Sequence, residues 1–161
     1  GTSVGCVAEG GRHRVVTCQN RLIVTGAMWQ APELDPGMSL ATQYGAYGAL
    51  VGHELSHAID ARGRMVDASG AIRDWWSGAE ATAWDATGQR VISLYDSFPY
   101  PQLSGVKVNG RLTRDENMAD LAGLELARSA IVAALPAGGV HSDKAFYHGW
   151  GKVWAQQETQ D

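Results

Sequence analysis

The sequence lacks long hydrophobic runs, is poor in cysteine and shows no concentration of positive charge. No segment approaches the roughly 18 uninterrupted apolar residues of a membrane-spanning helix, so we expect no membrane segment in this chain. The N-terminus also lacks the basic and then apolar pattern of a signal peptide. The 13 Lys and Arg residues are scattered, and the formal net charge is −4. This distribution argues against nucleic acid as a partner.

The two cysteines, Cys6 and Cys18, flank a predicted turn and do not form a C-x-x-C pair. Their spacing therefore fits a metal site poorly. The sequence is equally compatible with a disulfide bond between them, which would indicate an oxidising compartment, and with two buried free thiols.

The length and composition fit one globular domain. The chain has 161 residues, 45% of them hydrophobic, which suffices for one hydrophobic core. It contains no internal repeat, low-complexity tract or interdomain linker. We therefore expect residues 1–161 to form a single domain.

The hydrophobic pattern predicts a mainly helical α+β fold. Two β-rich runs, residues 14–17 and 22–25, predict a hairpin that supplies an edge strand. A second hairpin is expected over residues 106–113, around a type I′ turn at Asn109 and Gly110. Apolar residues at spacings of three and four predict helices over residues 40–62, 77–97 and 114–134, and from residue 142 onward.

The first predicted helix, residues 40–62, carries a stripe of glycines. Gly45, Gly48 and Gly52 each cost about 1 kcal/mol of helix propensity relative to alanine. Such a loss is tolerable where another backbone packs closely, so we expect this helix to be deeply buried. Gly63 is expected to end the helix as a C-terminal cap.

The segment before the second predicted helix contains two aromatic residues and a helix-start signal. Ser77 and Glu80 have the spacing of a capping box. We expect the adjacent Trp75 and Trp76 to pack in the core rather than to contact a ligand.

Residues 51–60 contain the strongest chemical signal of the chain, the run His-Glu-Leu-Ser-His. His53 and His57 are four residues apart, so on a helix they lie on one face about one turn apart. Two imidazoles at this spacing can bind one Zn²⁺, while Glu54 points at the water on the metal's open position. The alternative is a chance arrangement, which we estimate at below about 1% for this composition. The motif predicts a zinc-dependent hydrolase.

A catalytic zinc usually has three protein ligands and a water. We favour Glu116 as the third ligand, because Asp120 follows it by one helical turn and could accept the other N–H of a bound imidazole. Asp60 could do the same for His57. Thr113 and Glu116 also fit a capping box, in which the carboxylate would only bind backbone. Other carboxylates stay open as the third ligand: Glu125, Glu80 and Asp115.

Five stretches of the chain carry a family resemblance, in order and in spacing: residues 52–60, 63–64, 74–76, 108–113 and 116–123. From about Asn20 to Trp154 the chain resembles the catalytic half of the neprilysin-like zinc metallopeptidases, which are gluzincins. The resemblance implies a thermolysin-like zincin core with a small β-hairpin edge element. It also implies one Zn²⁺ per chain, hydrolysis of peptide bonds, and an extracellular or periplasmic location.

The resemblance further implies a role for each candidate residue. The metal ligands would be His53, His57 and Glu116, and the general base would be Glu54. Asp60 and Asp120 would be the carboxylates that hold the two imidazole rings, and Asp120 is also predicted to be catalytic. The strand containing Val15 and Val16 would lie beside the cleft and bind the peptide substrate.

The chain departs from the family pattern at several positions. Residues 12–15 replace an Asn-Ala-aromatic segment that holds substrate, Ala61 stands where a second Asp is usual, and Leu121 stands where an Asn is usual. We expect no counterpart of the family's helical cap domain, and we expect the His and Arg that bind the oxyanion to fall beyond Asp161. These departures predict an impaired enzyme, or one completed by a second polypeptide or by homodimerisation. The rival hypothesis is a non-catalytic zinc-binding module that recognises peptides.

Overall fold

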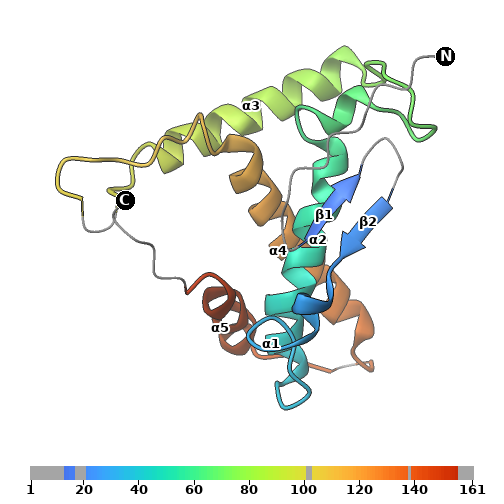
Figure 1. Ribbon diagram of the computed structural model, residues 1–161, viewed down its shortest axis with the longest axis vertical. Coiled ribbons are helices and arrows are strands. Elements are labelled where there is room, and N and C mark those ends of the chain that lie inside the picture. Colours follow the sequence, from blue (N-terminus) through green and yellow to red (C-terminus); the bar gives the residue numbers. More distant parts are fainter. Residues whose placement is uncertain (1–12, 17–20, 101–102, 138, 156–161) are drawn as a thin grey trace.

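The computed structural model describes residues 13–16, 21–100, 103–137 and 139–155. Its centre is a pair of crossing helices, α2 and α4, with a β-hairpin beside α2 (Figure 1). The expected α+β, mainly helical fold is confirmed. The elements are β1 (His13–Val16), β2 (Arg21–Val24), η2 (Gly26–Trp29), α1 (Leu40–Gln43), η3 (Tyr44–Gly48), α2 (Ala49–Ser56), η4 (His57–Ile59), η5 (Gly63–Met65), α3 (Gly78–Tyr95), α4 (Arg114–Ala134) and α5 (Asp143–Val153).

The predicted hairpin is confirmed, with each strand starting one residue earlier than expected. β1 and β2 are antiparallel, and Val15 pairs with Leu22. Leu22 and Val24 of β2 line a small apolar pocket together with Leu50 and Val51 of α2. Within the described residues β1 pairs only with β2, so its other edge is unpaired there. Both cysteines lie outside the described residues.

The first long helix is one helical run through α1, the π-helical turn η3, α2 and the 3₁₀ turn η4. It ends at Asp60, whose backbone is extended (φ −74°, ψ −172°), so the predicted end at Arg62 is wrong. The carboxylate of Asp60 stops the helix by accepting the backbone N–H groups of Arg62 and Gly63 at 2.8 and 2.7 Å. Gly63 is not the C-terminal cap: a Cβ there would overlap the carbonyl oxygen of His57, and glycine lets the chain turn back over the helix end.

Gly45 and Gly52 of the glycine stripe pack against other backbone, as expected, whereas the nearest neighbours of a Cβ on Gly48 would be the side chains of Ala127 and Tyr44. A Cβ on Gly45 would overlap the backbone of Phe146 in α5, and a Cβ on Gly52 would lie 2.8 Å from the carbonyl oxygen of Gly123 in α4. The expected burial of this helix is confirmed for Leu50, which is 2% exposed, but not for Leu55 and Ile59, which are 49% and 48% exposed. The buried core at these contacts consists of Ala41, Ala49, Ala127, Ile131 and Phe146.

The predicted start of α3 is confirmed, but the prediction for the tryptophans before it is wrong. Both bonds of the Ser77 and Glu80 capping box form. Trp75 is 44% exposed and contacts Trp76 edge-on, with ring centroids 6.1 Å apart. The pair lies over α3 at the surface, because Trp76 packs on Trp84 rather than into the core around Phe146.

Trp84 connects α3 to the start of α4. The guanidinium carbons of Arg114 and Arg64 lie 4.7 and 5.8 Å from its ring centroid. Such cation–π contacts contribute about 0.5–1 kcal/mol each where they are exposed. The contact of Arg114 holds the first turn of α4 against α3 (Figure 1), and the contact of Arg64 joins η5 to α3.

The second predicted hairpin is wrong. Lys107 pairs with Pro99 in an isolated bridge, and residues 109–113 form turns that lead into α4. A type I′ turn needs positive φ, which among the described glycines occurs only at Gly70 and Gly105. The backbone N–H of Gly110 donates to Asp96 at the end of α3 at 2.7 Å.

The last two helices match their predictions. α4 has the predicted bounds, and Ser142 caps α5 by accepting the backbone N–H of Ala145 at 3.2 Å. Phe146 of α5 is fully buried. In the described part of the chain, no helix combines the length and apolar character needed to cross a bilayer.

Candidate metal centre

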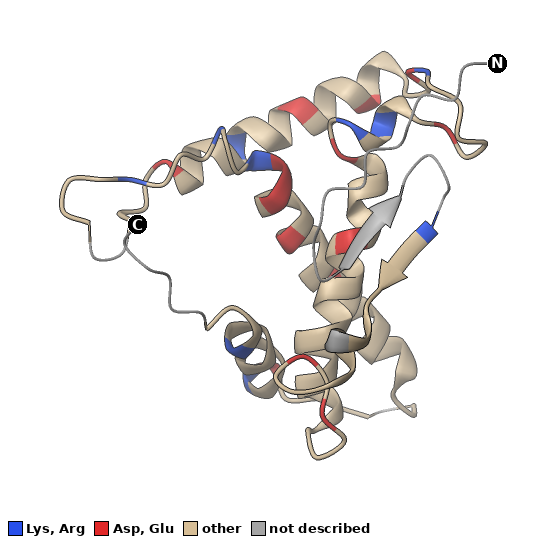
Figure 2. Ribbon diagram, in the orientation of Figure 1, with Lys and Arg blue, Asp and Glu red and all other residues tan. Residues whose placement is uncertain are grey.

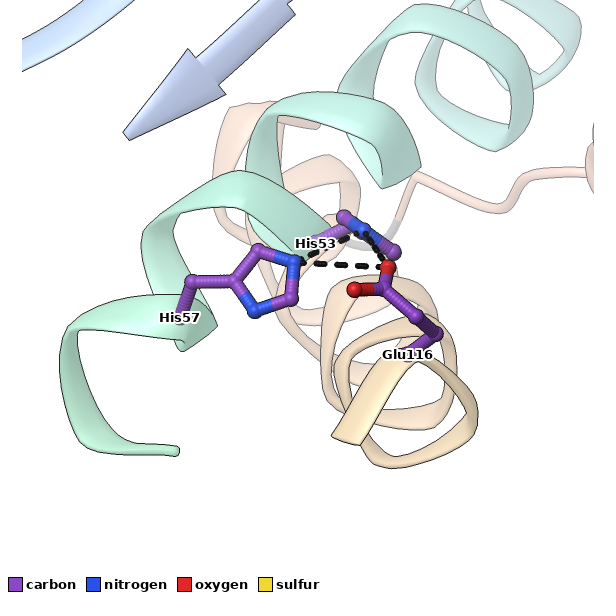
Figure 3. Close-up of side chains that lie close together, drawn as sticks. All are labelled: His53, His57 and Glu116. Carbon is purple, nitrogen blue, oxygen red and sulfur yellow. Dashed lines mark hydrogen bonds and ion pairs between the residues drawn. The ribbon is translucent and has the colours of Figure 1, made fainter. Parts of the chain in front are cut away.

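Three predicted ligands converge where α2 ends and α4 begins (Figure 3). The Nε2 atoms of His53 and His57 lie 3.1 Å apart. Oε2 of Glu116 lies 3.3 Å from Nε2 of His53 and 3.5 Å from Nε2 of His57. α2 and η4 supply the histidines, and the first turn of α4 supplies the glutamate.

The donor atoms fit a tetrahedral metal ion. With metal–donor bonds of about 2.0–2.1 Å, the donors of a tetrahedral site are about 3.3–3.4 Å apart. The three observed separations bracket this value. Two imidazole nitrogens and one carboxylate oxygen are also the donor set of catalytic zinc sites that keep a fourth position open. The group can therefore hold a metal ion.

Two aspartates orient the imidazole rings. Nδ1 of His53 lies 2.7 Å from Oδ1 of Asp120, and Nδ1 of His57 lies 2.8 Å from Oδ2 of Asp60. When Nδ1 carries the proton and donates it to the carboxylate, the lone pair of Nε2 is left for a metal. Both rings therefore present Nε2 to the same point.

The electrostatics of the centre favour positive charge. Hydrogen bonds to Asp60 and Glu116 raise the pKa of His57 to about 10. Burial acts to lower the pKa of His53, but hydrogen bonds to Asp120 and Glu116 outweigh it and raise this pKa to about 9. Hydrogen bonds from the two histidines hold the pKa of Glu116 far below its usual value. Acidic residues are concentrated on the first turns of α4 (Figure 2).

Glu54 lies between this centre and the hairpin. Its side chain is buried, and Oε1 is 4.0 Å from Nε2 of His53. It lines the small pocket formed with Leu22 and Val24 of β2. A carboxylate in this place is close both to the metal position and to the strand pair.

Of the four carboxylates considered as the third ligand, the structure brings Glu116 to the two histidines. Thr113 makes no capping bond, so the capping-box alternative for Glu116 is not formed. Glu80 is engaged in the cap of α3, and Asp115 accepts a bond from Arg114 at 2.9 Å. Glu125 is not part of the group whose ligand atoms meet.

Sequence reasoning assigned no role to Gly123 or Ser56, which lie at the contact between the two ligand-bearing helices. Gly123 touches the backbone of α2, and the buried hydroxyl of Ser56 donates to the carbonyl of His53 at 2.6 Å. The spacing of Gly123 from Glu116, seven residues or two helical turns, is a signal that could have identified it.

The protein has a zincin-like fold: its mainly helical core brings two histidines and a glutamate together, and it resembles the catalytic regions of solved metallopeptidases. The chain belongs to peptidase family M13, whose model matches residues 16–161. It is 30% identical to human endothelin-converting enzyme 1 over 150 residues, which are 88% of this chain and 19% of that protein. It is 29% identical to neprilysin-1 of Caenorhabditis elegans over 154 residues, 88% of this chain and 20% of that protein.

Solved structures agree with this assignment. PepO from Lactobacillus rhamnosis HN001 superposes with a TM-score of 0.76 and 31% identity, over 89% of this chain and 22% of that one. The zinc metalloprotease Zmp1 of Mycobacterium tuberculosis superposes with a TM-score of 0.80 and 28% identity, over 88% of this chain and 23% of that one. The predicted family resemblance is confirmed, and the chain spans about a fifth of the length of the curated relatives it matches.

Proposed function

We propose that this chain carries the catalytic zinc centre of a metalloendopeptidase, with His53, His57 and Glu116 as ligands and one Zn²⁺ per chain. The observation that carries the proposal is the meeting of three donor atoms at 3.1–3.5 Å from one another. Membership of family M13 supports zinc rather than another metal ion. When bound, zinc supplies a water of lowered pKa and polarises the scissile carbonyl.

Glu54 acts as the general base in this proposal. It accepts the proton of the attacking water and passes it to the amine that leaves when the peptide bond breaks. Its burial and its position beside Nε2 of His53 support the role, since proton transfer requires the carboxylate within reach of that water.

The carboxylates of Asp60 and Asp120 hold the imidazoles in this proposal, each by accepting an Nδ1–H. The role of Asp120 is therefore to position His53 and to stabilise the charge that the ring gains from a bound cation.

A peptide substrate would bind along β1. Its unpaired edge in the described structure offers backbone N–H and C=O groups to an added strand. Val15 and Val16 lie in this strand, and their contact with substrate stays a prediction. So does the completion of the site by a second polypeptide or a second copy of the chain.

Metal content and hydrolysis test the proposal together. The wild-type chain, His57→Ala, Glu116→Ala and Glu54→Gln are loaded with Zn²⁺, analysed for metal and incubated with a mixed peptide library. We expect one zinc in the wild type, loss of zinc in His57→Ala and Glu116→Ala, and zinc without hydrolysis in Glu54→Gln. Glu125→Ala is the matched control for Glu116→Ala, because Glu125 is an exposed residue of the same helix.

Each outcome distinguishes a different function. A wild-type chain that binds no zinc would overturn the proposal. A chain that binds zinc and peptides but hydrolyses none would identify the rival peptide-recognition module. Equal hydrolysis by the wild type and Glu54→Gln would assign the activity to a contaminant.

A further inference from the structure

The two helices that carry the proposed ligands touch backbone to backbone. A Cβ on Gly123 of α4 would lie 2.5 Å from the carbonyl oxygen of Ala49 and 2.5 Å from the backbone nitrogen of His53. A Cβ on Gly52 of α2 would lie 2.8 Å from the carbonyl oxygen of Gly123. Non-bonded carbon contacts are ordinarily about 3.5–4.0 Å, so no side chain fits between α2 and α4 here.

This contact is directly linked to the metal centre. One of the atoms that touches Gly123 is the backbone nitrogen of His53 itself. On α4, Asp120 precedes Gly123 by one turn and Glu116 precedes it by two, so all three lie on the face toward α2. Helices are stiff over two turns, about 10 Å. The separation of the helices at Gly123 therefore sets the place of Asp120 and Glu116 relative to His53.

The tolerance of the centre is smaller than the shift that a methyl group would cause. An alanine at position 123 must move away from Ala49 and His53 by roughly 1–1.5 Å to bring its Cβ from 2.5 Å to an ordinary contact distance. Metal sites tolerate deviations of about 0.2 Å in ligand distance. The same shift along the bond would lengthen the 2.7 Å separation of His53 and Asp120 beyond the range of a hydrogen bond. The flexible side chain of Glu116, 66% exposed, can follow part of the movement, but the shorter Asp120 cannot.

We propose that Gly123 is a positioning residue for the metal centre: its missing side chain fixes Asp120 and Glu116 at the distance from His53 that a metal ion requires. The inference rests on the metal centre proposed above and adds a residue that touches neither metal nor substrate. Gly123 would thus differ from closely packed glycines whose contacts serve only the packing of the fold.

Gly149→Ala is the matched control for Gly123→Ala. A Cβ on Gly149 of α5 would overlap the carbonyl oxygen of Thr42 in α1 to nearly the same degree. Thr42 precedes His53 by 11 residues, about three turns of the first long helix, and α5 carries no proposed ligand. Both variants add one methyl group inside a helix and against a neighbouring backbone, and both should lower the melting temperature. Zinc affinity is measured by competition with a chelator on folded protein, and the visible spectrum of bound Co²⁺ reports the geometry of the donors.

We expect Gly123→Ala to bind zinc about 10 to 100 times more weakly, as when the hydrogen bond to a metal-bound imidazole is lost, and to change the Co²⁺ spectrum. Gly149→Ala should keep both unchanged. If Gly123→Ala matches the wild type in affinity and spectrum while melting earlier, the contact serves packing alone and the proposal is wrong. A wild type without zinc would instead overturn the proposed function.

A milder variant covers the case in which Gly123→Ala does not fold. Gly52→Ala intrudes on the same contact from the other helix, at 2.8 rather than 2.5 Å. It should weaken zinc binding in the same direction and by a smaller factor. An unchanged affinity in Gly52→Ala would contradict the positioning role.

Discussion

Replacing Asp120 by alanine should weaken zinc binding while the fold persists. Asp120 accepts the Nδ1–H of His53 at 2.7 Å, and the His53 ring is only 6% exposed, so little water can replace the lost carboxylate. A hydrogen bond to a charged group contributes about 1.5–3 kcal/mol. Since a tenfold change in affinity is about 1.4 kcal/mol, the zinc dissociation constant should rise about 10 to 100-fold.

The measurement is competition with a chelator of known affinity, on Asp120→Ala, Asp120→Asn and the wild type. The asparagine variant keeps an oxygen acceptor but removes the charge, so its affinity should fall between the other two. Asp85→Ala, which removes an exposed aspartate of α3, is the control for a general loss of negative charge. An affinity of Asp120→Ala equal to that of the wild type would refute the reasoning, because the carboxylate would then not orient the metal-bound ring.

Three further predictions follow from the same structure. Zinc affinity should rise with pH between about 6 and 8, because the pKa values of His53 (about 9) and His57 (about 10) are raised and zinc must displace protons from both rings. Calorimetry in buffers of different ionisation enthalpy should detect this proton release. The absence of proton release would contradict this account. Phe146→Ala should lower the free energy of unfolding by about 3–5 kcal/mol in urea titration, since the ring is fully buried. Ser77→Ala should lower it by about 0.5–2 kcal/mol through loss of the capping box, and Ser93→Ala, an exposed serine later in α3, should cost less.

Patterns confined to one helix were predictable from the sequence. The bounds of α4 and the caps at Ser77 and Ser142 follow from residues within a few positions of one another. The histidine pair is equally local. Glu116 is different, because it lies 59 residues after His57 and only tertiary packing brings it there. Its spacing from Asp120 favoured Glu116 but left other carboxylates open as the third ligand, and the family resemblance implied Glu116 alone.

The errors at Gly63 and Gly110 share one physical cause. Glycine can be required for a positive φ or for the absence of a side chain, and local sequence does not separate the two. Gly63 and Gly110 were predicted as a helix cap and a hairpin turn, yet each lies where a Cβ would overlap a neighbouring carbonyl oxygen, of His57 and Ile92 respectively. The prediction for Trp75 failed for another reason: the aromatic pair does not show which face of the chain is buried, and Trp75 packs on its neighbour Trp76 at the surface. The single-domain assignment and the state of the cysteines stay predictions.

The ligands of the metal centre are far apart in the sequence: α3 and the turns around it lie between His57 and Glu116. A metal bound to His57 and Glu116 would therefore close a loop of roughly 60 residues, as a disulfide bond would. In the chain-entropy model, a permanent crosslink of this size restricts the unfolded chain by about 4 kcal/mol. A zinc ion that stays bound to both ligands during unfolding would restrict the unfolded chain in this way. Its removal should then lower the free energy of unfolding even though α3 itself loses no contact.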